Sequence, residues 1–508
     1  MNRQTMPQFP HSYWYEHIEL PNFNPLAETV KTEVAIVGGG ITGITTAYLL
    51  SKKGVKVTLI DAGSLLSGTT GHTTAKVTVQ HGLIYDQLIN NFDLETAKLY
   101  YAANKSALEF ISNTVDELQI NCDFEHETAY LYTNSDDYIE KLMKEKDAYE
   151  QIGIDHSLVK ELPINIPIKL ALKIKKQAKF HPLKYLTSVI NECVKHNVQF
   201  YENTVAVDLE YTNHPVVLTK EGQRISCDYV ILASHYPFYD GLAFFPTRMY
   251  ADRSYIAAFK YDEEYPGGMY ISAESPNRSI RTAKDESGED ILLIGGESHK
   301  VGQGKMTIEH YEALQKFAVE NFKVGDFLYR WSAQDLVTLD NVPYIGSITK
   351  SKENILVATG FRKWGMTTST LAAQIFSDTI TNHRNVYKDI FAPSRKVANN
   401  AIKNFIKYNA DVAKHLIKGK MEYAQSSKEI EKDTATIMRI HGKRAGVYRD
   451  LDDKLHIVDT TCTHLGCEVN WNDGERTWDC PCHGSRFSYT GEVIDGPAKE
   501  PLERIKTT

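Results

Sequence analysis

The sequence has no excess of positive charge, no long run of purely apolar residues and few cysteines. Lysine and arginine together number 57 against 65 aspartates and glutamates, which gives a net charge of −8. A nucleic-acid binder usually carries the opposite balance, so we expect no nucleic-acid partner. One uncharged stretch, residues 34–51, approaches the length of a membrane span, but it contains four glycines and three threonines whose pattern has another explanation below.

The amino terminus lacks an apolar core followed by a cleavage site, so no secretory signal is visible and we expect a cytoplasmic protein. Apolar residues make up 42% and charged residues 24% of the chain, which excludes a mostly disordered or collagen-like protein. Cys122, Cys193 and Cys227 stand alone and are expected to be small core residues. The other four of the seven cysteines lie within the final fifty residues, and this clustering indicates metal or redox chemistry.

A glycine-rich turn marks the first motif. Residues 32–60 are predicted to run strand, turn, helix and strand, and Gly38, Gly40 and Gly43 are spaced as G-x-G-x-x-G after the first strand. In such a βαβ unit the glycines allow a tight turn, close approach to a pyrophosphate and close helix packing. Asp61 ends the second strand, where a carboxylate can accept hydrogen bonds from ribose hydroxyls. The motif predicts a dinucleotide site and does not separate FAD from NAD.

Three distant stretches resemble the D-amino-acid-oxidase-like family of flavoproteins: VAIVGGGITGITTAYLLSKKG, CDYVILASH and ATGFRKWGMTTSTLAAQI. The resemblance covers roughly residues 30–390 and implies bound FAD. It implies an α/β Rossmann-type FAD-binding domain with an interleaved mixed-sheet substrate domain. With Asp61 and the three motif glycines, the residues that it places at the cofactor are Thr70, His72, Val205, Gly360, Gly365 and Met366.

The same resemblance implies an arginine for a substrate carboxylate and an aromatic side chain over the flavin ring. Arg253, Tyr255 and Arg281 lie in predicted strands of the substrate domain, and Lys363 lies in the loop beneath the flavin. Each of them, taken singly, fits a packing or surface role better. We therefore assign no catalytic side chain from the sequence.

The segment Ser67-Gly-Thr-Thr-Gly-His72 resembles the stretch of dimethylglycine and sarcosine dehydrogenases whose histidine is joined covalently to FAD. The sequence departs from that stretch, with Gly71 in place of a tryptophan. Three roles for His72 stay open: a covalent link, a hydrogen bond near the flavin, and an ordinary loop position.

The second motif is Cys462-Thr-His464, followed after fifteen residues by Cys480-Pro-Cys-His483. Two thiolates and two imidazoles suit either one tetrahedral zinc ion or the two irons of a Rieske [2Fe–2S] cluster. Zinc fingers usually pair Cys with Cys and His with His, whereas each box here supplies one of each. The mixed pairing favours the cluster.

The stretch from CTHLGC to CPCHGSRFSYTGEVIDGPAKEPL resembles Rieske proteins over about 75 residues. The resemblance implies a small all-β domain in which Cys462 and Cys480 hold one iron while His464 and His483 hold the other.

The Rieske resemblance also implies a disulfide between Cys467 and Cys482, a pair found in respiratory and photosynthetic members. Ser485 matches a residue that donates a hydrogen bond to a bridging sulfur. Phe487 stands where high-potential members carry a tyrosine donor, so either the reduction potential drops or Phe487 simply packs the small core.

The expected order along the chain is an amino-terminal extension (1–30), the oxidoreductase region (31–394), a helical linker (395–430) and the Rieske domain (431–508). Residues 395–420 carry apolar residues at near-helical spacing, with seven Lys or Arg against one acid, Asp411. Such a helix either packs its apolar stripe on its own protein or lies on an anionic membrane surface on the cytoplasmic side.

A flavin accepts two electrons and a [2Fe–2S] cluster carries one, so their combination converts two-electron chemistry into one-electron transfer. We predict a dehydrogenase that oxidises an amine or amino acid at FAD and passes electrons through the cluster to a quinone, cytochrome or other carrier. A reductase that feeds an oxygenase, and a binding or assembly protein with a structural cluster, stay open as alternatives. The sequence has no second clear G-x-G-x-x-G for a nicotinamide cofactor, which weighs against the reductase.

Overall fold

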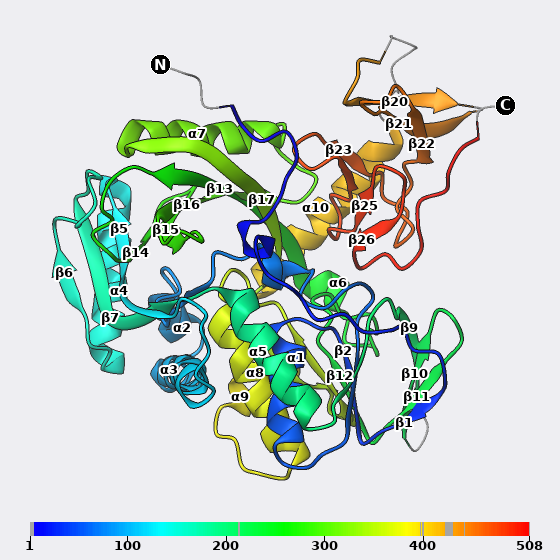
Figure 1. The fold of residues 1–508 in the computed structure, drawn as a ribbon, viewed down its shortest axis with the longest axis horizontal. Helices are drawn as coiled ribbons and strands as arrows, with labels where there is room; N and C mark the ends of the chain where they lie inside the picture. Colours follow the sequence, from blue (N-terminus) through cyan, green and yellow to red (C-terminus); the bar gives the residue numbers. More distant parts are fainter. Residues whose placement is uncertain are drawn as a thin grey trace.

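The computed structural model of the chain describes residues 5–211, 214–396, 398, 401–421, 430–440 and 442–506. A large amino-terminal unit contains three of the sheets, and a small β unit follows it at the upper right of Figure 1. One helix, α10 (Ala401–Met421), lies between the two units (Figure 1). Among the helices of the described ranges, none is both long and apolar enough to span a membrane.

The first sheet has the strand order β18-β19-β12-β2-β3-β8, and all neighbours except β18 and β19 are parallel. Its strands are β2 (Val34–Val37), β3 (Val57–Ile60), β8 (Gln199–Tyr201), β12 (Tyr229–Leu232), β18 (Tyr344–Thr349) and β19 (Lys352–Thr359). On one face, α5 (Pro182–Lys195) and α8 (Gly365–Ile380) both pack on α1 (Ile41–Ser51). The parallel strands and these helices form the predicted Rossmann-type α/β arrangement.

A smaller sheet covers the opposite face of the first. Its strands are β1 (Val30–Lys31), β11 (Arg224–Ser226), β10 (Pro215–Thr219) and β9 (Ala206–Tyr211), in that spatial order. Along β2, Val34 and Ile36 enter the helix-side core, whereas Ala35 and Val37 enter the core beneath the smaller sheet. The two-residue period of a strand explains why β2 is apolar throughout.

The second large sheet is mixed and forms the upper left of Figure 1. Its strands, in spatial order, are β17 (Val324–Thr338), β13 (Met249–Tyr261), β16 (Asp290–Lys300), β15 (Arg278–Lys284), β14 (Met269–Ser272), β5 (Glu125–Thr133), β7 (Leu170–Lys179) and β4 (Lys76–Val77), with β6 (Ser157–Val159) paired to β7. Its strands contact α4 (Asp136–Ile152), α6 (Phe245–Arg248) and α7 (Ile308–Asn321). Helices α2 (Tyr85–Asn91) and α3 (Leu94–Glu117) pack on α4, and α9 (Lys388–Phe391) contacts β18 of the first sheet. The long pair β13 and β17 reaches from this sheet towards the carboxy-terminal unit (Figure 1).

The carboxy-terminal unit consists of two small antiparallel sheets. One contains β20 (Thr434–Ile440), β21 (Lys443–Arg449) and β22 (Leu455–Asp459). The other contains β23 (Asn470–Asn472), β24 (Thr477–Asp479), β25 (Arg486–Ser488) and β26 (Val493–Asp495). The core between them includes the two cysteine loops, with Trp478 and Phe487 fully buried.

Candidate active site and metal centre

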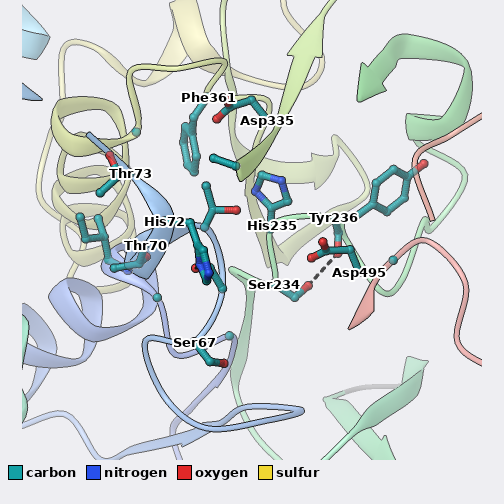
Figure 2. Close-up of a pocket in the computed structure, with 18 of the residues that line it drawn as sticks. Ser67, Thr70, His72, Thr73, Ser234, His235, Tyr236, Asp335, Phe361 and Asp495 are labelled. Carbon is teal, nitrogen blue, oxygen red and sulfur yellow. Dashed lines mark hydrogen bonds between the residues drawn. The ribbon is translucent and has the colours of Figure 1, made fainter. Parts of the chain in front are cut away.

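A cavity of about 610 Å³ lies where the first sheet, the second sheet and the carboxy-terminal unit meet. The loop after β2 forms one wall, and residues of β13 and β17 form another. Residues 492–499 of the carboxy-terminal unit form a third. Figure 2 shows Asp335 and Phe361 at one end of this pocket and Ser67 at the opposite end.

The glycine turn has the geometry that its motif predicts. Gly38 has a φ of +117°, and a Cβ there would lie 2.4 Å from the carbonyl oxygen of Ala233. A Cβ at Gly43 would lie 1.9 Å from the carbonyl oxygen of Gly38, so α1 can approach the turn this closely only with glycine. The sharp turn and the close helix contact are therefore both built into the sequence.

Asp61 supports the turn from the end of β3. Its Oδ2 accepts a hydrogen bond from the Gly39 amide at 2.7 Å, and its Oδ1 accepts one from the Gly63 amide at 2.9 Å. Burial raises the pKa of Asp61, and these two amides oppose the shift. Asp61 also lines the cavity, and a carboxylate oxygen can accept a second hydrogen bond, so the predicted ribose contact is compatible with this position.

Of the ten predicted cofactor residues, those that line the cavity are Gly38, Gly40, Asp61, Thr70, His72, Val205, Gly365 and Met366. Gly43 and Gly360 lie behind the wall. At Gly360, where φ is +77°, an added Cβ would lie 2.4 Å from Cγ2 of Thr338. These two glycines shape the cavity through packing.

His72 ends the short helix η2 (Thr69–His72) and faces the cavity. Its Nδ1 lies 2.9 Å from the carbonyl oxygen of Gly68, so Nδ1 is the donor and carries the proton. Burial lowers the pKa of His72, which keeps the ring neutral and leaves Nε2 without a proton. An unprotonated ring nitrogen in the cavity suits both a covalent and a hydrogen-bonding role.

The amino-terminal extension fixes the loop that carries His72. The Trp14 indole donates a hydrogen bond to the Thr73 carbonyl at 2.7 Å, and the Tyr15 hydroxyl donates one to the Leu66 carbonyl at 3.0 Å. The Tyr15 ring also meets the His72 ring edge-on at 5.7 Å.

The same tyrosine explains the departure from the dehydrogenase pattern at residue 71. A Cβ at Gly71 would lie 1.9 Å from the Tyr15 hydroxyl oxygen, so Tyr15 occupies the volume that a larger side chain at Gly71 would need.

The two arginines that were candidates for a substrate carboxylate are engaged elsewhere. Arg253 donates to Ser332 at 2.9 Å and to Gln334 at 3.0 Å, and it forms a buried ion pair with Asp479 at 3.4 Å. Within the described part of the chain, Arg281 donates to the backbone carbonyls of Thr74, Ala75 and Thr282, at 2.7–2.9 Å. Their packing role, which the sequence favoured for each taken singly, is the one observed.

Other charged groups face the cavity instead. Nζ of Lys363 lies 3.0 Å from Oδ2 of Asp252, and Lys76 donates a hydrogen bond to the Tyr270 carbonyl at 2.9 Å. Burial lowers the pKa of Lys76 to about 7. Asp335 of β17 is 7% exposed, and within the described residues its carboxylate accepts no hydrogen bond and forms no ion pair. Burial raises its pKa to about 7, against the opposing charge of Lys363.

The four clustered cysteines divide into a bridge and two free thiols. Cys467 and Cys482 form a disulfide, as the Rieske resemblance implied, whereas Cys462 and Cys480 are buried and free. The sulfur atoms of Cys467, Cys480 and Cys482 lie within 4.8 Å of one another, but the bridge leaves only Cys480 of these three as a thiolate ligand. A hydrogen bond with Cys480, and a smaller one with Ser485, lower the pKa of Cys462 to about 7 although burial raises it.

The two predicted histidine ligands meet across the same site. The rings of His464 and His483 are 5.0 Å apart at an angle of 88°. The Nδ1 atom of His483 is buried and has no hydrogen-bond partner in the described structure. Buried polar atoms are rarely left unpaired, and a metal ion would satisfy this one. The two imidazoles meet and the two thiols share a hydrogen bond, and this donor set fits a mixed-ligand iron cluster.

The cluster-binding region is docked on the cavity wall. The Gln334 side chain on β17 donates to the Gly484 carbonyl at 2.8 Å, and a Cβ at Gly484 would lie 2.3 Å from Cβ of Ala251 on β13. The Arg253–Asp479 ion pair lies in the same interface, with side-chain exposures of 1% and 4%. The second cysteine loop is therefore packed against the two strands that border the cavity.

Two family models match the chain. The model described as FAD dependent oxidoreductase matches residues 33–379, and the model described as Rieske [2Fe-2S] domain matches residues 421–506. The chain belongs to the FAD-dependent oxidoreductase family. Its carboxy-terminal unit is a Rieske domain. The predicted fold class and both predicted cofactors, FAD and a [2Fe–2S] cluster, are confirmed.

A protein of Bacillus subtilis (strain 168) named Rieske 2Fe-2S iron-sulfur protein YhfW is 48% identical over 505 residues, which cover 99% of each chain. Gamma-glutamylputrescine oxidoreductase of Escherichia coli (strain K12) is 21% identical over 371 residues, covering 70% of this chain and 85% of that protein. Glycine oxidase from Geobacillus kaustophilus superposes with a TM-score of 0.61 at 16% identity, covering 73% of this flavoprotein and all of that chain. At 16% identity, this likeness shows a shared fold alone.

Several residues of the flavoprotein's cavity were not predicted from the sequence. Asp335 lies on β17, where polar and apolar residues are mixed without a motif that marks a site. His235 follows β12, in a stretch that sequence analysis used only for its resemblance to flavoproteins. Residues 492–499 of the Rieske domain line the cavity through a contact between distant segments, for which the sequence holds no local signal.

Proposed function

We propose that the protein is a dehydrogenase that oxidises an amine or amino acid at FAD and passes the electrons singly through the Rieske cluster to an external acceptor. The observation that carries this proposal is the packing of Gly484 against Ala251 and Gln334, beside the cavity. A cluster in this loop lies next to the flavin site. A purely structural cluster would not need that position.

When bound, FAD supplies the two-electron acceptor and the cluster supplies the one-electron carrier. The chain's residues hold both. The glycine turn and the amino end of α1 would receive the pyrophosphate, since backbone N–H groups and the helix dipole favour anions there. We assign Cys462 and Cys480 to one iron, and His464 and His483 to the other.

We assign Asp335 to the amino group of the substrate. Among the described residues that line the cavity, it is the carboxylate with no ion-pair or hydrogen-bond partner, and an ammonium group beside it would supply that partner. Oxidation of an amine requires its lone pair, so the substrate must give up a proton before or during the reaction. A carboxylate whose pKa lies about 7 can hold that proton near neutral pH.

The Rieske domain would also limit the entry of water into the cavity. Its residues 492–499 close one side, with Asp495 on the same wall as His235 and Tyr236 (Figure 2). Excluding water strengthens the electrostatic interactions inside the site.

The acceptor would meet the opposite side of the cluster. His483 is 6% exposed and precedes Gly484, whose carbonyl accepts the hydrogen bond from Gln334 of β17, whereas His464 is half-buried and its neighbour Leu465 is 59% exposed. This asymmetry supports entry of electrons at the His483 side and exit at the His464 side, to a quinone, cytochrome or other carrier.

Anaerobic rapid mixing with a panel of amines and amino acids tests the proposal. A substrate should first bleach the flavin absorbance and then produce the electron resonance signal of the reduced cluster. Reduction of both centres by a nicotinamide cofactor and by none of the panel would favour the reductase for an oxygenase. Failure of the flavin to transfer electrons to a cluster that dithionite reduces would contradict the proposed direction.

A further inference from the structure

Helix α10 buries only part of its apolar stripe. Tyr408 is 5% exposed and donates a hydrogen bond to the Cys482 carbonyl at 3.1 Å, and Val412 and Leu416 pack on the Rieske core. By contrast, Ile402 and Ile406 are 66% and 64% exposed. One edge of the stripe therefore holds the Rieske domain, and the other edge faces solvent.

The exposed edge has the spacing of one helix face. Ile402, Phe405 and Ile406 follow an i, i+3, i+4 pattern, and Phe405 is 43% exposed. A membrane-surface or partner-binding helix shows this pattern, because a solvated helix without a partner usually presents polar side chains there.

A second segment adds apolar side chains beside this edge. Leu242 is 76% exposed and Phe244 is 60% exposed, and both lie within the three residues before α6. Asn409 of α10 donates a hydrogen bond to the Thr247 carbonyl of α6 at 3.1 Å, so the two segments touch. The Asp240 carboxylate accepts the Phe244 amide at 3.0 Å, which fixes this turn.

We call Leu242, Phe244, Ile402, Phe405 and Ile406 the apolar face. These are five of the large apolar side chains with at least 40% exposure in the described structure, gathered on two contacting segments. Contiguous exposed apolar patches on monomeric proteins often mark interaction sites.

Positive charge accompanies the apolar face. Lys403, Lys407 and Lys414 are exposed on α10 at an i, i+4, i+11 spacing, which places them in one row. The single acid of residues 401–417 is Asp411, and its carboxylate lies 2.7 Å from Nζ of Lys300. The row of lysines therefore keeps its charge uncompensated by its own helix, within a protein whose net charge is −8.

We propose that the apolar face and the lysine row bind the surface of an anionic lipid bilayer. Apolar side chains that enter the headgroup region, flanked by lysines that meet anionic headgroups, are the combination such binding needs. A second copy of this chain fits less well, because a twofold contact through the same face would bring the two lysine rows together.

Binding would also place the cluster near the membrane, because the other side of α10 contacts the loop that contains Cys482. A lipid-soluble acceptor could then reach the Rieske domain without leaving the bilayer surface. Only this consequence rests on the proposed function; the vesicle binding itself does not.

Sedimentation of the full-length, cofactor-loaded protein with vesicles tests the proposal. We expect binding to vesicles of equal phosphatidylcholine and phosphatidylglycerol at about 0.01 M salt and its loss at about 1 M, where the Debye length falls from roughly 30 Å to 3 Å. Vesicles of phosphatidylcholine alone should bind far less. Absence of binding to the anionic vesicles at low salt overturns the proposal.

Matched variants separate this face from the rest of the surface. Phe405→Glu with Ile406→Glu should weaken binding at least tenfold, while Val386→Glu, at an apolar position 56% exposed on another segment, should not. Lys407→Gln should weaken it about fivefold, since each lysine near an anionic surface contributes about 1 kcal/mol, and Lys98→Gln should leave it unchanged. Flavin and cluster spectra report whether each variant is folded.

Two results would count against the bilayer as the occupant. Wild-type binding that survives the double glutamate substitution would overturn the assignment of the face. Sedimentation equilibrium that shows a dimer in the wild type and a monomer in the double variant would identify the face as a contact between copies of this chain.

Discussion

Gln334 joins the flavin region to the cluster loop, because its side chain donates a hydrogen bond to the Gly484 carbonyl at 2.8 Å. The next residue of the same strand, Asp335, lines the flavin cavity. Successive side chains of a strand point to opposite faces, so two neighbouring positions of β17 serve the two redox sites. The strand is a short physical connection between them.

Replacing Gln334 should therefore affect the electron step between the centres more than the flavin step. Gln334→Leu removes the bond to Gly484 and also one of the three side-chain partners of Arg253, which should lower the free energy of unfolding by about 1–3 kcal/mol. We expect unchanged flavin bleaching and slower cluster reduction in anaerobic stopped-flow traces. Gln303→Leu, which loses a longer 3.4 Å contact to the same loop, is the control and should have a smaller effect. Equal cluster rates in Gln334→Leu and wild type would show that this contact does not matter.

The loop that carries His72 should tolerate a methyl group at one glycine and reject it at another. Gly71→Ala would place a Cβ 1.9 Å from the Tyr15 hydroxyl, so the loop must shift and FAD occupancy should fall. Gly68→Ala is the matched control, because a Cβ there meets nothing within 4 Å. Flavin content per chain after gel filtration measures both. Full occupancy in Gly71→Ala would mean that the loop position is not critical.

His72 should contribute to flavin retention in either of its open roles. His72→Ala should lower flavin affinity, because the ring faces the cavity with Nε2 free of a proton. Acid precipitation of the wild type then decides the chemistry: yellow colour in the pellet indicates a covalent link, and colour in the supernatant indicates a noncovalent one. Unchanged flavin affinity in the variant would leave His72 as an ordinary loop residue.

Asp335 should make substrate binding depend on pH near neutrality. Its pKa is raised to about 7, so it is neutral below that pH and can attract an ammonium group only above it. KM for a cationic amine should therefore fall as pH rises through about 7 in the wild type. In Asp335→Asn, KM should be higher and lack this dependence.

The thermal stability of Asp335→Asn provides the folding control. Raising the pH should improve substrate binding by the wild type but lower the stability of the wild type. A carboxyl whose pKa is raised on folding contributes stability below its unfolded pKa and loses it as pH rises to the folded value. Asp335→Asn removes that loss, so its Tm should exceed that of the wild type at pH 8 and differ little at pH 4. A wild-type KM that is flat between pH 6 and pH 8 for every active amine would refute the assignment.

Each histidine ligand should be required for the cluster and dispensable for the flavin. His464→Ala or His483→Ala should abolish the electron resonance signal of the reduced cluster, because the second iron loses one of its two protein ligands beyond the shared sulfides. Flavin absorbance should persist, since the dinucleotide turn is distant in sequence and built by the first sheet. Two irons per chain are expected in the wild type. Stoichiometric zinc in anaerobically prepared protein would instead support the tetrahedral alternative.

Much of the site was predictable because its signals are local. The strand, turn and helix around Gly38 and Gly43 form within one contiguous segment, and the glycines are required by contacts inside it. The cysteine and histidine boxes likewise place their ligands on two short loops. In both cases the residue types follow directly from the chemistry that the loops must perform.

The parts that escaped prediction depend on packing between distant segments. Arg253 lies in a predicted strand, but the sequence does not say which face of that strand meets the Rieske domain. Asp335 lies on β17, a 15-residue strand without clean alternation, because its two faces meet different protein neighbours. Tyr15 fills the volume beside Gly71 although it lies 56 residues earlier in the chain, and no local sequence pattern predicts such a contact.

The cavity wall formed by residues 492–499 has a consequence for the biogenesis of the protein. Because the ribosome makes the chain from its amino terminus, the matched flavin region, residues 33–379, emerges before this wall exists. A nucleotide can enter the nascent site from the side that the Rieske domain later closes. Once that domain has docked, residues 492–499 cover that side of the site, so the order of synthesis lets the flavin bind before the wall forms.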